Sequence, residues 1–231
     1  MTEHRKGILY CIGVGPGEPE LMTLKAARMI KECQVAAIPH VDRAQCVAYQ
    51  IAVQAVPELE EKELLCLDMP MTKDKDLLAR SHETAAGRLL EQLEQGRDVA
   101  LLTLGDSSVY ATSVYLGGRL EDAGIETEMV SGVPSFCAVA ARLNIPLVKN
   151  SEELHILPAS YQIEEGLKLP GVKVLMKAGR KLSQVKQLLA QGNYQVTMVE
   201  NCGMPGERVY RTVEEIPEDA GYFSLLIVRD L

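Results

Sequence analysis

Short apolar runs alternate with helix-like patterns through the first half of the chain. Apolar runs predict strands at 8–14, 35–38, 98–104 and 125–130. Apolar positions with helical spacing predict helices at 23–33, 76–95 and 109–123. Gly96 and Gly124 follow two of these helices at the position where a glycine commonly ends a helix. Strands that alternate with helices of this length indicate a parallel sheet in an α/β fold.

The first predicted helix has a recognisable start. Thr23 is a suitable N-cap because its hydroxyl can accept a hydrogen bond from a free backbone N–H of the first turn. Leu24, Ala27 and Ile30 recur at helical spacing, so we expect them on one apolar face.

The second half of the chain has a different pattern. Strands are predicted at 172–176, 195–200, 208–213 and 222–229, and a helix at 181–191. Strands that follow one another with short connections favour antiparallel pairing. We therefore expect two α/β domains, 1–128 with a mainly parallel sheet and 129–231 with a mixed sheet.

Composition narrows the class of protein. The chain has 231 residues, of which 47% are hydrophobic and 24% charged, so it can bury a core without disulfides. It contains no apolar run of about 18 residues, so no membrane-spanning helix is expected. The run 8–14 leads directly into Gly15-Pro16-Gly17 without a cleavage site, so we expect a core strand and not a signal peptide. We therefore also expect a cytoplasmic location. The net charge of −8 gives no general attraction to nucleic acid or to anionic membranes.

Cysteine and histidine spacing does not indicate a metal site. None of the six cysteines forms a Cys-x-x-Cys pair, and the four histidines have no ligand-like spacing. We expect no bound metal and free, buried thiols. With no Trp and two Phe, the chain also lacks the aromatic platforms that bind single-stranded nucleic acid.

Three loops, at 13–20, 103–110 and 131–135, each follow a predicted strand and precede a helix. The first begins Gly-x-Gly, but Glu18 stands where a dinucleotide site needs glycine and Pro16 lacks a backbone donor. Ligands of open α/β sheets bind at the carboxyl edge of the strands, so three loops there predict one ligand site.

The second loop allows two interpretations of its acidic residue. Gly105 permits a close backbone approach, and Asp106 either caps the next helix or shapes the loop around a small polar cofactor. The chain shows no Gly-x-Ser-x-Gly elbow and no phosphate-binding P-loop. Their absence suits methyl transfer from a sulfonium, in which positioning carries most of the catalysis.

The segments at 13–26 (GVGPGEPELMTLKA) and 105–110 (GDSSVY) resemble two signatures of the tetrapyrrole (corrin/porphyrin) methylases. The resemblance runs from residue 7 to the end of the chain. It implies two α/β domains of the class III methyltransferase type, with S-adenosylmethionine in the cleft between them, and a homodimer. One departure is Ser107, where the family usually has proline, so we expect a less rigid loop here.

Within this family, the segments 105–112, 131–136, 140–147 and 200–210 are most similar to C20-methyltransferases of precorrin-2 or cobalt-factor II. The implied reaction is methylation at C20 in cobalamin biosynthesis, with S-adenosylhomocysteine as product. Whether the substrate already holds cobalt stays open. The alternatives are another ring position or another tetrapyrrole such as uroporphyrinogen III or a later precorrin, a nucleotide-cofactor oxidoreductase, and a non-catalytic binding module.

The resemblance also implies site residues by position. Cofactor contacts are expected at Pro16, Gly105, Asp106, Val109, Tyr110, Pro134, Ser135, Met176, Lys177, Cys202, Leu225 and Leu226. No catalytic residue is identified, although Asp106 and Tyr110 are expected to position the reactants. Because early corrinoid precursors carry eight carboxylates, we expect a basic substrate trough formed by Arg28, Lys149, Lys177 and Arg180.

Overall fold

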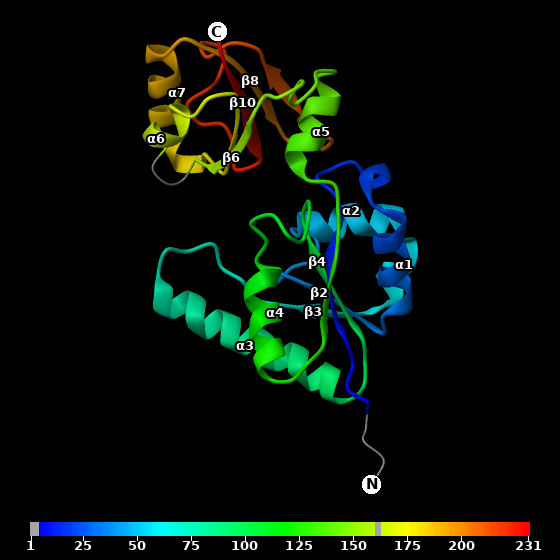
Figure 1. Ribbon diagram of the computed structural model, residues 1–231. Helices are drawn as coiled ribbons and strands as arrows, with labels where there is room; N and C mark the ends of the chain where they lie inside the picture. The colour runs from blue at the N-terminus through cyan, green and yellow to red at the C-terminus, as the bar shows by residue number, and fades with distance from the viewer. Residues whose placement is uncertain (1–4, 160–162) are drawn as a thin grey trace. The chain divides into compact units, whose positions relative to one another are not determined.

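The chain folds into two α/β units, each built around its own five-stranded sheet. The computed structural model describes residues 5–159 and 163–231. The units are Met1–Pro134 and Ser135–Leu231, so the division falls a few residues after the predicted end of the first domain at 128. Figure 1 shows the sheets and helices of each unit.

The first sheet is entirely parallel, with strand order β3-β2-β4-β1-β5. Its strands are β1 (Leu9–Gly13), β2 (Val35–Ile38), β3 (Glu63–Cys66), β4 (Val99–Thr103) and β5 (Thr127–Val130). The helices of this unit are α1 (Leu24–Glu32), α2 (Val47–Ala55), α3 (Lys75–Glu94) and α4 (Ser113–Asp122), with short 3-10 turns η1 (Pro19–Leu21) and η2 (Pro57–Glu61). The parallel sheet predicted for the first half is confirmed.

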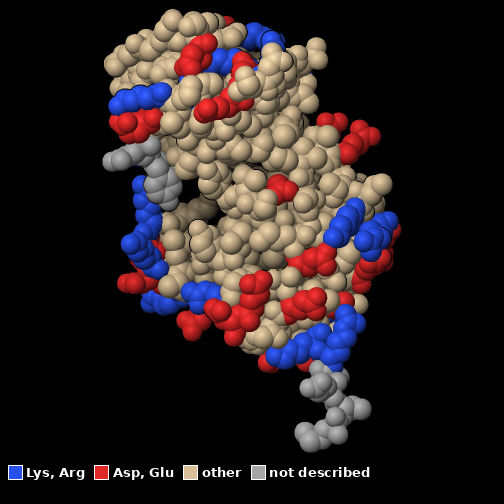
Figure 2. Space-filling model, in the orientation of Figure 1, with Lys and Arg blue, Asp and Glu red and all other residues tan. Residues whose placement is uncertain are grey.

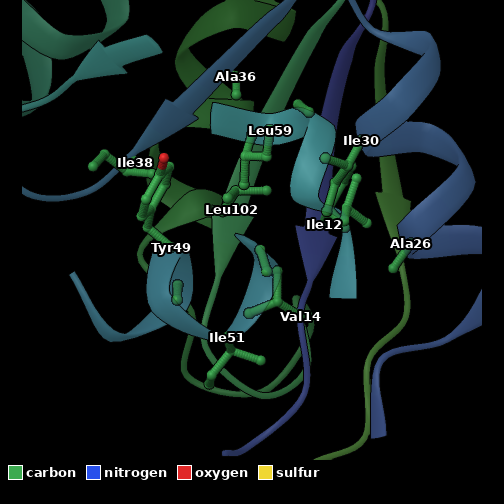
Figure 3. Close-up of a cluster of buried hydrophobic side chains, with 14 of the residues drawn as sticks. Ile12, Val14, Ala26, Ile30, Ala36, Ile38, Tyr49, Ile51, Leu59 and Leu102 are labelled. Carbon is green, nitrogen blue, oxygen red and sulfur yellow. The ribbon is translucent and has the colours of Figure 1, made fainter. Parts of the chain in front are cut away.

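Helices cover this sheet on both faces, as a parallel sheet requires. One buried cluster joins Ile30 of α1 and Ile51 of α2 to Ile12 and Leu102 of the sheet, as the close-up in Figure 3 shows. A second cluster packs α3 and α4 against the opposite set of strand residues. The two clusters fix the strand ends that carry the loops.

The start of α1 confirms Thr23 as its N-cap, because the Thr23 hydroxyl accepts a hydrogen bond from Ala26 N at 3.1 Å. The predicted apolar face is confirmed at Ile30 and at Ala27, which packs against the core, but it is wrong at Leu24. Leu24 is 91% exposed, and the buried residues are Ala26, Met29 and Ile30. Leu24 is the first residue of the helix, before the turn that contacts the sheet.

Other boundaries were predicted with mixed success. Gly96 and Gly124 have φ angles of +78° and +73°, which confirms their role at helix ends. Helix α4 begins at Ser113, four residues later than predicted, because the preceding residues form a looped turn. Helix α2 and strand β3 were not predicted.

The second sheet is mixed, with strand order β6-β7-β10-β8-β9. Its strands are β6 (Leu154–Pro158), β7 (Val172–Met176), β8 (Tyr194–Glu200), β9 (Arg208–Tyr210) and β10 (Ser224–Asp230). Its helices are α5 (Ser135–Arg142), α6 (Glu164–Leu167) and α7 (Leu182–Gln191), with the 3-10 turn η3 (Gly179–Lys181). Strand β6 pairs parallel with β7, and the other pairs are antiparallel, which confirms the predicted mixed sheet. Among the described residues, no helix is long and apolar enough to cross a membrane.

Candidate functional site

Three loops of the first unit meet at the carboxyl edge of its sheet. They follow β1, β4 and β5, which are neighbours because β1 lies between the other two strands. Gly15 N donates to Gly105 O at 3.1 Å, and Gly105 N donates to Gly15 O at 2.8 Å, so the first two loops are joined as a short antiparallel bridge. The predicted meeting of the three loops is confirmed.

Glycines make this close approach possible. A Cβ atom on Gly132 would lie 2.1 Å from Gly105 O, and one on Gly13 would lie 2.7 Å from both Gly105 O and Gly132 N. All the atoms that these Cβ atoms would meet belong to the backbone, which cannot turn aside as a side chain can. The three loops therefore present main-chain atoms within a space that only glycine permits.

Asp106 holds the second and third loops together. Its Oδ1 accepts hydrogen bonds from Ser108 N at 2.8 Å and Ser108 Oγ at 2.5 Å, and its Oδ2 accepts one from Gly132 N at 2.9 Å. Burial raises the pKa of this carboxyl, but the hydrogen bonds from Ser108 and Gly132 outweigh it, so the pKa is below its usual value. Of the two interpretations, the loop-shaping role is the one observed, because α4 begins only at Ser113.

Ser107 is buried, with 1% of its surface exposed, and its hydroxyl donates to Val130 O at 3.1 Å. The residue that departs from the family pattern therefore joins the second loop to the last residue of β5. Thr23, the N-cap of α1, makes a corresponding contact with the third loop, since its hydroxyl donates to Ser131 O at 3.1 Å. The sequence did not indicate either contact, because both acceptors are backbone carbonyls.

The other predicted contacts of the first unit lie in or beside these loops. Pro16 is buried and Val109 is half-buried. Tyr110 is 45% exposed and has a φ angle of +49°, a left-handed conformation that is uncommon for a bulky residue. Such conformations gather at functional sites, where the surrounding structure holds them in place. Pro134 is the last residue of the first unit.

In the second unit, the predicted residues lie at one edge of the mixed sheet. Met176 ends β7 and pairs with Leu225 near the start of β10. Lys177 follows with a φ angle of +58°, and partial burial lowers the pKa of its ammonium group. Leu226 is fully buried in the core cluster with α7, on the opposite face of β10 from Leu225. Ser135 is the first residue of α5.

Cys202 lies two residues beyond the end of β8, at the same edge. The pairing of Glu200 with Ser224 places the end of β8 beside the start of β10. Asn201 and Gly203 on either side of Cys202 have φ angles of +53° and +71°, so the chain turns sharply here. Met176, Lys177, Leu225 and Cys202 thus lie at one edge of the mixed sheet, whereas Leu226 faces the core. Their contacts with a cofactor stay a prediction.

The predicted substrate trough has cations in both units. Arg28 is exposed and forms an ion pair with Glu32 at 2.8 Å, and Lys149 is also exposed. Lys177 is partly buried, and the side chain of Arg180 lies outside the described residues. On the face seen in Figure 2, acidic and basic side chains are interspersed over the first unit. The trough stays a prediction.

The thiols are free, as predicted, but they are not all buried. Cys11, Cys33 and Cys46 are buried, Cys66 and Cys202 are intermediate, and Cys137 is exposed. In the part of the chain that the structure describes, no group of three or more His, Cys, Asp or Glu side chains could hold a metal ion.

The chain is similar to known tetrapyrrole methylases over almost its whole length. Residues 8–217 match the family model of the Tetrapyrrole (Corrin/Porphyrin) Methylases. The chain is 34% identical to the probable cobalt-precorrin-2 C(20)-methyltransferase of Methanocaldococcus jannaschii, over 96% of this chain and 95% of that protein. It is 30% identical to the cobalt-precorrin-2 C(20)-methyltransferase of Salmonella typhimurium, over 96% of both.

Solved structures show the same fold. A cobalt-precorrin-4 methyltransferase matches with a TM-score of 0.74 at 18% identity, covering 96% of this chain and 94% of that one. The uroporphyrin-III C-methyltransferase of Thermus thermophilus, complexed with S-adenyl homocysteine, matches with a TM-score of 0.69 at 23% identity, covering 96% and 97%.

Proposed function

Because the chain belongs to the tetrapyrrole (corrin/porphyrin) methylase family, we propose that it methylates C20 of precorrin-2 or its cobalt form in cobalamin biosynthesis. One observation carries this proposal. Two relatives of almost equal length, at 34% and 30% identity, are named as C20-methyltransferases of cobalt-precorrin-2. A precorrin-2 C(20)-methyltransferase from Sinorhizobium is 28% identical over 96% of this chain, so the metal-free substrate is also represented among the relatives.

The proposed methyl donor is S-adenosylmethionine, which supplies a methyl group on a positively charged sulfonium. In the first unit, the three loops that pack together at Gly13 and Gly132 would hold the donor, and the Cβ position of Gly105 faces open space with no atom within 4 Å. Asp106 stays ionised at neutral pH since its pKa is lowered. Its carboxylate is engaged by Ser108 and Gly132, so its part is to keep the loops in place.

In the second unit, the ends of β7 and β8 would provide the remaining donor contacts. Met176, Lys177 and Leu225 share one sheet edge with the turn around Cys202. Left-handed backbone conformations at Lys177 and Asn201 turn the chain at this edge. Chemistry at a sulfonium needs no protein nucleophile, so orientation of donor and acceptor is the work left to these residues.

The test is direct methylation of defined substrates. The protein is incubated with S-adenosylmethionine and either precorrin-2 or cobalt-factor II, and the products are analysed by mass spectrometry and by NMR with a labelled methyl donor. The expected product gains one methyl group at C20. A methyl group at another ring carbon would contradict the C20 assignment, and no methylation of either substrate would contradict the proposal.

A second candidate stays within the same chemistry. The chain is 27% identical to the uroporphyrinogen-III C-methyltransferase of Pseudomonas aeruginosa over 95% of its length. Uroporphyrinogen III is therefore the third substrate in the assay. Calorimetry with S-adenosylhomocysteine separates all methyltransferase candidates from an oxidoreductase or a non-catalytic module, which would not bind it. We also propose a cytoplasmic homodimer, and light scattering that gives the mass of a single chain would contradict the dimer.

A further inference from the structure

The carboxylate of Glu207 contacts the turn that contains Cys202. Neither the sequence pattern nor the family resemblance gave this residue a role. Glu207 Oε2 accepts a hydrogen bond from Gly203 N at 2.8 Å, across four residues of the turn. The side chain of Glu207 is 18% exposed, so it is partly shielded from water. A charged acceptor makes a stronger hydrogen bond than a neutral one.

The second oxygen of the same carboxylate connects the turn to a helix. Arg142 Nε, at the last residue of α5, donates to Glu207 Oε1 at 2.6 Å. The guanidinium balances the charge of the carboxylate and fixes its orientation. Glu207 therefore ties the turn to α5, 65 residues earlier in the chain.

The backbone of the turn passes through three left-handed residues. Asn201, Gly203 and Gly206 all have left-handed φ angles, of +53°, +71° and +81°. Glycine adopts this conformation at no steric cost and asparagine at little cost, so these residues permit the turn without fixing its shape. Two short backbone bonds, Met204 N to Asn201 O and Glu207 N to Met204 O, close the turn from within. Asn201 Nδ2 also donates to Gly206 O at 3.5 Å, and the Glu207 carboxylate adds a charged acceptor for the Gly203 amide.

From this geometry we infer that Glu207 is a positioning residue for the methyl donor. It holds the 201–206 turn in the shape that presents its main chain at the sheet edge shared with Met176 and Leu225. Arg142 supports the carboxylate from α5. This inference rests on the proposed function, since it assumes that the donor contacts this edge.

The test compares Glu207→Ala and Glu207→Gln with the wild-type protein and with Glu218→Ala. Glu218 is an exposed glutamate of the same unit, outside the turn, and serves as the matched control. Loss of a hydrogen bond to a charged acceptor corresponds to roughly a tenfold to hundredfold weaker interaction. We expect Glu207→Ala to raise the Kd for S-adenosylhomocysteine by about tenfold or more, and Glu207→Gln by less, because the amide oxygen can still accept from Gly203.

Two further readouts separate positioning from a general structural effect. The Gly203 amide should exchange with solvent faster in Glu207→Ala than in the wild-type protein, whereas amides in the middle of β8 and β10 should not change. The KM for the methyl donor should rise while the KM for the tetrapyrrole stays the same. If Glu207→Ala lost its fold, these measurements would be made on Glu207→Gln.

The outcomes are distinguishable. Wild-type affinity for S-adenosylhomocysteine in Glu207→Ala, or an equal rise in both KM values, would overturn the positioning role and leave the methyltransferase proposal intact. A wild-type protein that does not bind S-adenosylhomocysteine would overturn the proposed function itself.

Discussion

Adding a single methyl group at Gly132 should separate the three loops. In Gly132→Ala the new Cβ atom would lie 2.1 Å from Gly105 O and 2.8 Å from Gly13 O. A comfortable carbon-to-oxygen contact is about 3.3 Å or longer, so the loops must part by roughly 1 Å. Since the clashing atoms are backbone, no side-chain rotation can relieve the contact.

The cost can be worked out from the contacts that this movement breaks. Gly132 N lies 2.9 Å from Asp106 Oδ2, and a shift of about 1 Å takes the pair beyond hydrogen-bond distance. Loss of a bond to a charged acceptor costs about 1.5–3 kcal/mol. Overpacking of a well-packed site costs about 1–3 kcal/mol more. We therefore expect Gly132→Ala to lower the free energy of unfolding of the first unit by about 2.5–6 kcal/mol.

A second glycine provides a matched control, for which we expect the free energy of unfolding to rise. Gly118 lies in the interior of α4, and a Cβ atom there would meet nothing within 4 Å. Gly118→Ala should therefore stabilise the helix by about 1 kcal/mol. Urea unfolding followed by circular dichroism should give a lower midpoint for Gly132→Ala and a higher midpoint for Gly118→Ala. Calorimetry should show weakened binding of S-adenosylhomocysteine only in Gly132→Ala. Wild-type unfolding and wild-type affinity in Gly132→Ala would refute the close packing of the loops.

Three further outcomes are expected. The pKa of Asp106 is lowered in the folded state, so its ionised form stabilises the fold above the unfolded pKa near 4, and this contribution is lost as the pH falls through the folded pKa. The urea midpoints of wild type and Asp106→Asn should therefore converge on acidification, and a difference between them that does not change with pH would contradict this. Lys173 is fully buried and its Nζ lies 2.5 Å from Asp230 Oδ1, so Asp230→Asn should lower the free energy of unfolding by about 1.5–3 kcal/mol, whereas a wild-type urea midpoint would mean that the pair contributes nothing. Iodoacetamide at pH 8 should modify the exposed Cys137 before the buried Cys11, whose pKa burial raises to about 11, and mass spectrometry of the peptides would reveal the reverse order.

Sequence periodicity predicted the elements that have a clear alternation and clear ends. Gly96 and Gly124 marked helix ends correctly because a left-handed residue is needed there. Helix α2 escaped prediction since apolar residues occupy most of its length and its cap, Cys46, makes no side-chain bond. Strand β3 has four residues and begins with an exposed glutamate, so it offers little pattern.

The candidate site was predictable in outline and not in its contacts. Three loops after three strands could be located from sequence, and the sheet order brought them together. The contacts that Asp106 makes with Gly132 N and Ser107 makes with Val130 O depend on backbone atoms that lie far away in the sequence. No local pattern encodes such partners, because any residue supplies the same backbone N–H or carbonyl.

With Ser107 in place of proline, the second loop is held in its conformation by a hydrogen bond. A proline restricts its own backbone covalently, whatever surrounds it. The serine instead relies on Val130 O, at the end of a strand that has a neighbour, β1, on one side of the sheet. A disturbance that frays the outer strand of this sheet would therefore also loosen a loop that follows an inner strand, and the two would melt as one cooperative segment.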